Sequence, residues 1–389
     1  AFILFYLAIR NYAWEKMLAF GLAIFLSWGV FSFGVRSQIT GFLFFNLLLW
    51  LFSKIRSKEK MAFFLPPIML LWANTHGSFV IGLVLLAFGG LYWGVNQSSK
   101  ILPTAIILMF SLAATLLNPF GLKIYPEVWR HFAGVNLAGL IAEWVPPTPA
   151  FWWLTLLSAI GLLFYILFLG RLKNWPWAAL TLALAVLALK ARRNLPFYFS
   201  WFFFIFLSLP PTKLSLAGWL KQKALRNNLA ILTAAALLFF GLFIRLPETL
   251  ALNSSWNNYC QNQLLVYPCR AVEFLKKQPE KGLPAGKAGV IFNRYEWGGF
   301  LIWQLPEYKI FVDGRMPAWP TPEGKSPYTI YLETLQNQPG WEETFKNYHI
   351  DWILISPGTF MDLLLAPQPE KFGWEEVYRD KIAVIYQRR

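Results

Sequence analysis

Charged residues are scarce in this chain of 389 residues, making up 14% of it against 57% hydrophobic residues. A water-soluble domain of this length could not bury so much apolar surface, so this balance excludes an ordinary soluble globular protein. The apolar residues also gather in long runs, and a membrane-spanning helix needs about 20 mainly apolar residues. The sequence therefore predicts an integral membrane protein.

Aspartate is absent from residues 1–249, where five glutamates stand against 20 lysines and arginines. Residues 250–389 hold 15 basic and 15 acidic residues, so the net charge of +15 comes entirely from the apolar part. Lysine and arginine accumulate in the cytoplasmic loops of membrane proteins, which explains the surplus without nucleic acid as a partner.

Cysteine and histidine are rare as well. Cys260 and Cys269 are the only cysteines, and there are three histidines, so no metal signature can be recognised. Both a disulfide and a pair of free thiols are compatible with the two cysteines. The cofactors stay unknown at this stage, with a divalent cation as an open alternative.

The apolar runs predict a polytopic α-helical membrane domain of about 9–10 spans over residues 1–249. Pro66 and Pro67 should kink or break the run at 61–74, so residues 61–95 form either two spans or a re-entrant hairpin. The chain begins inside an apolar run, so we expect a further N-terminal segment. The predicted runs are 1–9, 17–34, 39–52, 61–74, 78–95, 101–117, 151–170, 176–189, 195–210 and 228–246.

Alternate loops differ in positive charge: one set carries 13 lysines and arginines and the other set carries 6. The richer set should face the cytoplasm. The protein is then expected in the cytoplasmic membrane, with residues 250–285 as a linker or helical connection and 286–389 as an extracytoplasmic domain.

Three cations of the poorer set, Lys190, Arg192 and Arg193, crowd into four positions. They either reach lipid phosphates from helix ends or bind the phosphate of a lipid-linked substrate, for which planar arginine forks are suited. We expect such a phosphate to lie in a cavity shared with Arg36 and His76.

Other polar groups should reach the same face. His76 is either a hydrogen-bonded turn residue or an acid-base group or metal ligand. Asn118 is typical of a helix stop, and Asn74 is a candidate substrate contact. Glu127 and Glu143 are the only carboxylates in these loops between spans, which makes Glu143 a candidate general base.

Residues 286–389 alternate short β runs with amphipathic stretches, which predicts a small α/β domain with a partly parallel sheet. Strands are expected at 289–293, 308–315 and 350–356, and helices at 297–305, 328–348 and 359–365. A closing hairpin is expected to turn at Arg379–Asp380. Asp313 and Arg315 stand at the end of the strand expected at 308–315, where they form either a turn or part of a substrate site.

Five motifs together resemble the GT-C group of polyprenyl-phosphate-sugar-dependent glycosyltransferases, and more closely bacterial multi-span membrane proteins of that type. They cover most of the chain: WxNxHGxF at Trp72–Phe79, NPxGLxxY at Asn118–Tyr125, ARRNxP at Ala191–Pro196, FNxYxWGGxLIW at Phe292–Trp303, and DGR at Asp313–Arg315.

The resemblance implies inverting transfer of a sugar from a lipid-phosphate donor at the outer leaflet. It also implies an acidic residue in the first extracytoplasmic loop, for which this chain has no match. The envelope acceptor, whether glycan, lipid or protein, stays open. One alternative is a non-catalytic scaffold whose α/β tail binds glycans or proteins. Another is a transporter of lipid-linked sugars, although the inverted repeats expected of many transporters are not evident in this sequence.

Overall fold

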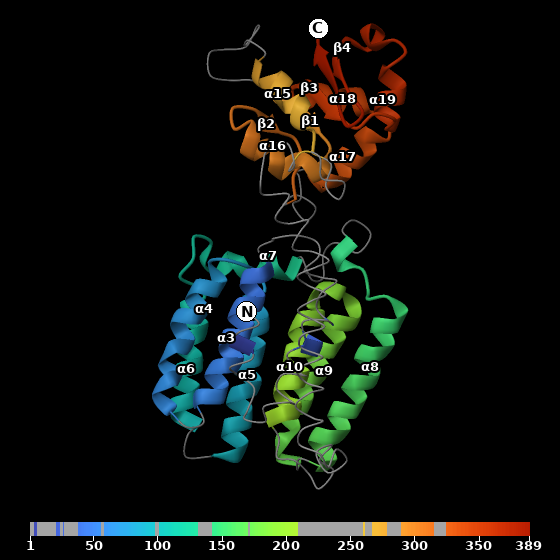
Figure 1. Cartoon of the computed structure of the whole chain (residues 1–389). Helices are drawn as coiled ribbons and strands as arrows, with labels where there is room; N and C mark the ends of the chain where they lie inside the picture. Colours follow the sequence, from blue (N-terminus) through green and yellow to red (C-terminus); the bar gives the residue numbers. More distant parts are fainter. Residues whose placement is uncertain are drawn as a thin grey trace. The chain divides into compact units, whose positions relative to one another are not determined.

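The structure is a computed structural model in which the chain divides into two compact units, Ala1–Leu242 and Phe243–Arg389 (Figure 1). We call them unit 1 and unit 2. The residues that it describes are 4–5, 21–23, 26, 38–55, 58–97, 101–130, 142–169, 172–208, 260, 267–277, 289–314 and 324–389.

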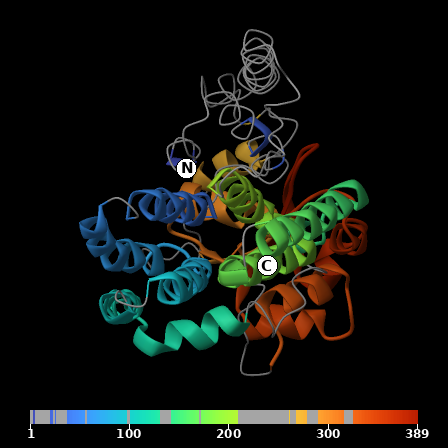
Figure 2. The ribbon, with the colours of Figure 1, turned by 90° about the horizontal axis from the view of Figure 1, so that it is seen from below.

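Unit 1 is built of apolar helices that run side by side (Figures 1 and 2). The helices that fall on predicted spans are α3 (Gln38–Ile55), α4 (Leu65–Ala73), α5 (Phe79–Asn96), α6 (Ile101–Ala114), α8 (Pro149–Phe164), α9 (Trp175–Lys190) and α10 (Leu195–Ser208). Within the described residues, three stretches are long and apolar enough to cross a membrane: Gln38–Ile55, Phe79–Asn96 and Pro149–Leu167. The protein is therefore membrane-associated, and the larger number of spans remains a prediction. The spans expected at 1–9, 17–34 and 228–246 lie outside the continuously described residues.

The break expected at Pro66 and Pro67 falls where a 3-10 helix (Glu59–Phe64) gives way to α4. Both prolines lie in the first turn of α4, where a missing N–H costs nothing because that donor would have no partner in the helix. The prolines therefore lie at the beginning of an α-helix and do not interrupt one.

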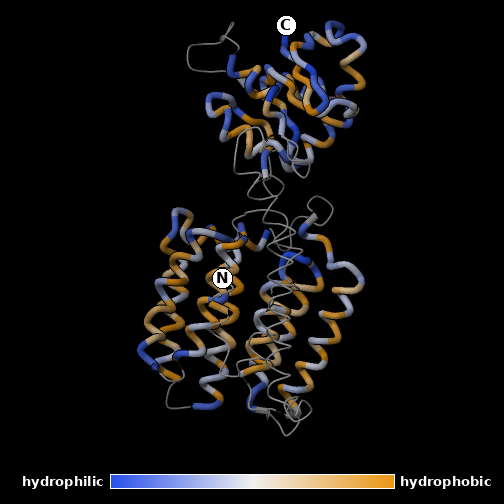
Figure 3. Tube along the Cα trace, viewed as in Figure 1, coloured by the Kyte–Doolittle hydropathy of each residue, from blue (hydrophilic) through white to orange (hydrophobic). Residues whose placement is uncertain are grey.

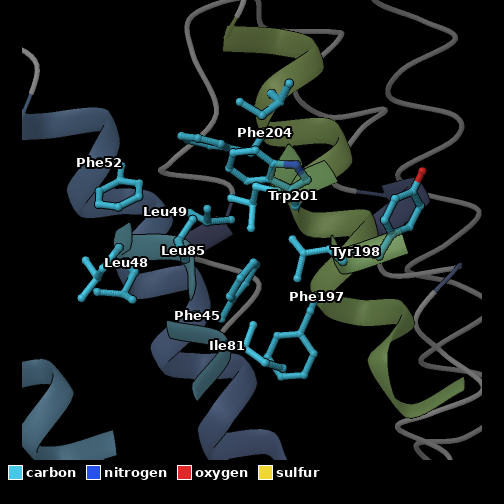
Figure 4. Close-up of a cluster of buried hydrophobic side chains, with 14 of the residues drawn as sticks. Phe45, Leu48, Leu49, Phe52, Ile81, Leu85, Phe197, Tyr198, Trp201 and Phe204 are labelled. Atoms are coloured by element: carbon cyan, nitrogen blue, oxygen red, sulfur yellow. The ribbon is translucent and has the colours of Figure 1, made fainter. Parts of the chain in front are cut away.

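Aromatic side chains fill the core between these helices. The rings of Phe45 and Phe197 meet edge to face at 5.2 Å, and Figure 4 shows them approaching each other from α3 and α10. The buried Trp201 donates a hydrogen bond from Nε1 to Thr181 Oγ1 on α9. Lipid tails are as apolar as these side chains, so close packing and such hydrogen bonds hold the helices together.

The connecting segments of unit 1 separate into two sets at opposite ends of the helices. At one end, Asn74 Nδ2 donates to the carbonyl of Leu117 and links the turn after α4 to the turn after α6. At the other end, Asn96 Nδ2 reaches the carbonyl of Lys173. Hydrophobic residues line the helices and hydrophilic ones gather toward their ends (Figure 3). For the loops that the structure describes, this grouping agrees with the alternation expected from the sequence.

Unit 2 contains a five-stranded sheet in the order β2-β1-β3-β5-β4. Strands β2, β1 and β3 are parallel, and β3, β5 and β4 are antiparallel, so the predicted partly parallel α/β domain is confirmed. The strands are β1 (Val290–Asn293), β2 (Lys309–Ile310), β3 (Ile350–Ile355), β4 (Trp374–Arg379) and β5 (Val384–Arg388).

Helices cover both faces of this sheet. Trp352 and Leu354 of β3 belong to one apolar cluster, together with α15 and α16, whereas Ile353 and Ile355 belong to the other cluster, together with α17, α18 and α19. Burial on both faces explains why β1 and β3 are apolar at nearly every position. The helices are α15 (Cys269–Lys277), α16 (Gly298–Gln304), α17 (Pro327–Leu335), α18 (Trp341–Asn347) and α19 (Phe360–Leu365).

Three predicted elements of unit 2 need correction. The strand expected at 308–315 is only the two residues of β2. The helix expected at 328–348 is two helices, because Asn337 and Gly340 have φ of 55° and 94°, which no right-handed helix accommodates. The hairpin turns at Asp380–Ala383 and not at Arg379–Asp380, because β4 continues through Arg379. The Asp380 carboxylate accepts from the amides of Ile382 and Ala383 in this turn.

A disulfide joins Cys260 to Cys269, the first residue of α15, which resolves the open alternative in favour of the bonded pair. The helix packs on the sheet through Ala271, Val272 and Leu275. Residues 250–285, expected as a linker or helical connection, thus contribute a packed helix to unit 2.

The motif FNxYxWGGxLIW has a structural explanation in unit 2. The buried Asn293 side chain bonds the backbone of Val312 through both its Nδ2 and its Oδ1. A Cβ added at Gly298 would lie 2.3 Å from the Val312 carbonyl oxygen and 2.7 Å from Asp313 Cα. These contacts hold the start of α16 against the segment that follows β2.

We expect Gly298→Ala to destabilise unit 2 by about 1–3 kcal/mol. The new methyl group would clash with the backbone of Val312 and Asp313, which could shift only at the expense of the surrounding packing. In hydrogen exchange of the full chain in detergent, the β1 amides should then exchange roughly tenfold to a hundredfold faster. Gly299→Ala is the matched control, since nothing lies within 4 Å of its added Cβ. Equal exchange in both variants would contradict the close approach.

Candidate functional site

Four segments of unit 1, far apart in sequence, meet at one end of the helices. They are the start of α3, the turn between α4 and α5, the 3-10 helix Ala142–Trp144 and the 3-10 helix Arg192–Asn194. We call the side chains that they bring together the polar cluster, defined as Gln38, His76, Ser78, Glu143 and Arg193.

Glu143 and Arg193 form the charged part of the polar cluster. Arg193 Nη1 lies 3.3 Å from Glu143 Oε1, with side chains 15% and 8% exposed, and Gln38 Nε2 donates to the same oxygen at 2.6 Å. The guanidinium also lies over the Trp144 ring, 4.4 Å from its centroid. Water screens the two charges only weakly at such burial. Removing one partner would therefore be costly, because the other charge would stay buried without a counter-charge.

The backbone reinforces this meeting of segments. The amide of Arg192 donates to the carbonyl of Val145 at 3.0 Å, which ties the ARRN motif to the loop that carries Glu143. Asn194 Nδ2 donates to the carbonyl of Leu187 near the end of α9. The arginine pair is thus attached on both sides to the ends of packed helices.

His76 is held by a chain of hydrogen bonds from α4 and α5. Its Nδ1 accepts from the Ser78 amide at 3.1 Å and lies 2.7 Å from Ser78 Oγ, which in turn accepts from Trp72 Nε1 at 3.1 Å. A backbone amide can only donate, so we assign the neutral ring with its proton on Nε2.

Gly41 of α3 makes room for this turn. A Cβ at position 41 would lie 2.1 Å from Ser78 Oγ and 3.3 Å from His76 Nδ1. Sequence reasoning missed both Gly41 and Ser78 as members of the site. Ser78 stands two residues from His76 and could have been suspected, whereas nothing local pointed to a glycine 35 residues upstream.

The electrostatic surroundings of His76 keep its ring neutral. Burial, and secondly the positive charge of Arg193, lower its pKa from 6.5 to about 4. The ring lies in the turn between α4 and α5, outside the helices themselves. At neutral pH it offers an uncharged N–H donor beside a cation, which suits an anionic oxygen.

The other predicted site residues divide into three groups. Lys190 lies exposed at the end of α9. Asn74 and Asn118 bond to the backbone of nearby turns, Asn74 to Leu70 and Leu117 and Asn118 to Thr115, Phe120 and Gly121. Arg36 and Arg315 lie outside the described residues, and Asp313 belongs to unit 2, where it is buried. Among the predicted residues, Arg193 and Glu143 are in contact, Arg192 is their neighbour through its backbone bond to Val145, and His76 lies near enough to Arg193 to feel its charge.

The part of the chain that the structure describes contains no group of three or more His, Cys, Asp or Glu side chains that could hold a metal ion. No protein-family model matches this chain, and no curated protein matches it.

We predict that His76 stays neutral down to a pH of about 4. Its folded pKa lies below the unfolded value, so the free energy of unfolding should fall as the pH drops from about 6.5 to about 4, where only the unfolded chain takes up the proton. Ring ¹⁵N spectra of the full chain in detergent micelles, assigned with His76→Gln, would measure the pKa and the tautomer of His76. Titration near 6.5, or a proton on Nδ1, would contradict it.

Proposed function

We propose that this chain is a membrane glycosyltransferase that moves a sugar from a polyprenyl-phosphate-linked donor to an envelope acceptor. The observation that carries the proposal is the Arg193–Glu143 ion pair at one end of an apolar helical unit, near enough to His76 for the charge of Arg193 to lower the pKa of the ring. A lipid-linked donor would present its phosphate at such an end, since its prenyl chain stays in the bilayer. The resemblance to the GT-C group supports the same reaction class.

The donor phosphate becomes a leaving group, so the site must stabilise its growing negative charge. Arg192 and Arg193 would bind the phosphate oxygens through charge-assisted hydrogen bonds, and the His76 Nε2–H would donate a further one. The contact between Arg193 and Glu143, at 3.3 Å, is longer than the 2.7–2.9 Å typical of such bonds, so a phosphate oxygen could compete with Glu143 for the guanidinium.

Glu143 is the carboxylate available to activate the acceptor. In the proposed reaction the acceptor oxygen attacks the anomeric carbon, the bond from this carbon to the phosphate oxygen breaks, and the phosphate keeps the electron pair. Glu143 takes the acceptor's proton. Gln38, which donates to Glu143 Oε1 at 2.6 Å, would hold the carboxylate in place when Arg193 turns to the phosphate.

We further propose that the polar cluster and unit 2 face the outside of the cytoplasmic membrane. The charge difference between the two sets of loops supports this orientation. The disulfide of unit 2 supports it as well, because such bonds persist in oxidising compartments.

Replacing Arg192 or Arg193 by glutamine should weaken donor binding by roughly tenfold to a hundredfold each, equivalent to about 1.5–3 kcal/mol per lost charge-assisted bond. Binding of a polyprenyl-phosphate sugar to the full chain in nanodiscs measures this. Lys173→Gln is the control, since Lys173 is exposed at the opposite end of the helices. Binding within about twofold of the parent in both arginine variants would reduce the pair to a lipid anchor.

Glu143→Gln should separate chemistry from binding. If Glu143 is the general base, sugar transfer should fall by about 10²–10⁴-fold while donor affinity holds or rises, because a negative charge beside the phosphate is lost. Single-turnover transfer and donor binding are measured on the same sample. Unchanged transfer would remove Glu143 from the reaction, and the absence of transfer in the parent chain would favour the non-catalytic scaffold.

A further inference from the structure

The segment that follows α6 lies across the ends of the unit 1 helices. It contains a turn, a 3-10 helix (Gly121–Lys123) and α7 (Ile124–Trp129), and both Figure 1 and Figure 2 show α7 running crosswise to the aligned helices. We call residues Leu117–Arg130 the crosswise segment.

One face of the crosswise segment is fixed to unit 1. The Tyr125 hydroxyl is hydrogen-bonded to Thr115 Oγ1, and its ring meets Phe79 edge to face at 5.7 Å. Ile124 and Val128 pack on the core of the helices, and a Cβ at Gly77 would lie 3.4 Å from Val128 Cγ2. The segment is therefore held in place beside the turn that carries His76.

Four other side chains of the crosswise segment are apolar and exposed. Leu117, Phe120, Leu122 and Trp129 are each about 70% exposed, at 69%, 67%, 72% and 71%. Gly121, with φ of 54°, and the Asn118 side chain, which accepts from the Phe120 amide, make the turn that presents these residues. Four large apolar side chains so exposed within 13 residues indicate contact with an apolar surface.

The preceding helix, α6, has an exposed apolar surface as well. Met109, Phe110 and Leu112 of α6 are 66%, 63% and 49% exposed, and α6 carries no charged residue. Such a face on a membrane-associated unit belongs against lipid tails. In the crosswise segment charges join the apolar residues: Lys123 is exposed, and Arg130 pairs with Glu127 at 2.8 Å. Apolar and aromatic groups mixed with charges are typical of the boundary between lipid tails and head groups.

We infer that the crosswise segment lies in the plane of one leaflet, with Phe120, Leu122 and Trp129 inserted at the boundary of acyl chains and head groups. This placement does not depend on the proposed function. It has a consequence for the polar cluster, because the contact of Val128 with the Gly77 position brings the His76 turn to the depth of lipid phosphates.

Spin labels on introduced cysteines test the depth directly. The two native cysteines are joined, so a label reacts only at the new thiol. Phe120→Cys, Leu122→Cys and Trp129→Cys are compared in the full chain, reconstituted in phosphatidylethanolamine and phosphatidylglycerol vesicles. Met109→Cys on α6 and Gln338→Cys on the exposed surface of unit 2 give the lipid and water references. All five positions are at the surface, so folding should persist.

The measurement is the collision of each label with lipid-soluble oxygen and with a water-soluble nickel complex. We expect the three labels of the crosswise segment to lie between the two references, nearer to Met109 than to Gln338. Values equal to Gln338 would place the segment in water, and values equal to Met109 would place it among the lipid tails. Low collision with both reagents would mean that protein covers it. Each of these three results overturns the inference.

Discussion

Polar groups in unit 1 must either find a partner inside an apolar helical unit or lie at its ends, because a lipid environment offers them no water. Several buried hydroxyls along the helices return to their own backbone: Ser111, Thr155 and Thr181 donate to the carbonyl four residues earlier. The charged residues near the helices instead lie where chains turn. This constraint concentrates reactive groups at the helix ends, and the polar cluster is one result.

The polar cluster combines groups whose properties depend on one another. Arg193 lowers the pKa of His76 in addition to the effect of burial, which keeps the ring neutral and leaves Arg193 as the cation beside it. Glu143 balances that cation, and Gln38 and Trp144 hold the two members of the pair. A site with the Arg193 cation, the neutral His76 donor and the Glu143 carboxylate would allow a phosphate to take the place of Glu143 beside Arg193. This exchange is the basis of the proposed transfer.

Unit 2 uses its most distinctive residues for its own architecture. Asn293 and Gly298 connect β1, α16 and the segment after β2, so this part of the motif is accounted for by packing. The Asp362 carboxylate accepts from Arg379 and Tyr386 and joins α19 to the β4–β5 hairpin. Its burial would raise its pKa, but these hydrogen bonds outweigh burial and lower it. These contacts give Asn293, Gly298 and Asp362 structural roles within unit 2.

The sequence by itself determined the class of the two parts and the identity of most elements. Apolar runs predicted the helices of unit 1, since their length and composition are local properties, and the apolar strand runs predicted β1 and β3 because both faces of the sheet are buried. It also marked His76, Glu143, Arg192 and Arg193 as candidates, because charged and titratable residues stand out in so apolar a chain.

Only the tertiary structure decided which of these residues meet. Residue types alone could not place Arg193 on Glu143, 50 residues away, or bring Gly41 of α3 against Ser78. The tertiary structure also showed that the Asn74 and Asn118 side chains bond to the backbone of turns and do not belong to the polar cluster. The physical reason is that such contacts depend on how helices pack, and packing is set by many weak, nonlocal interactions that no single motif contains.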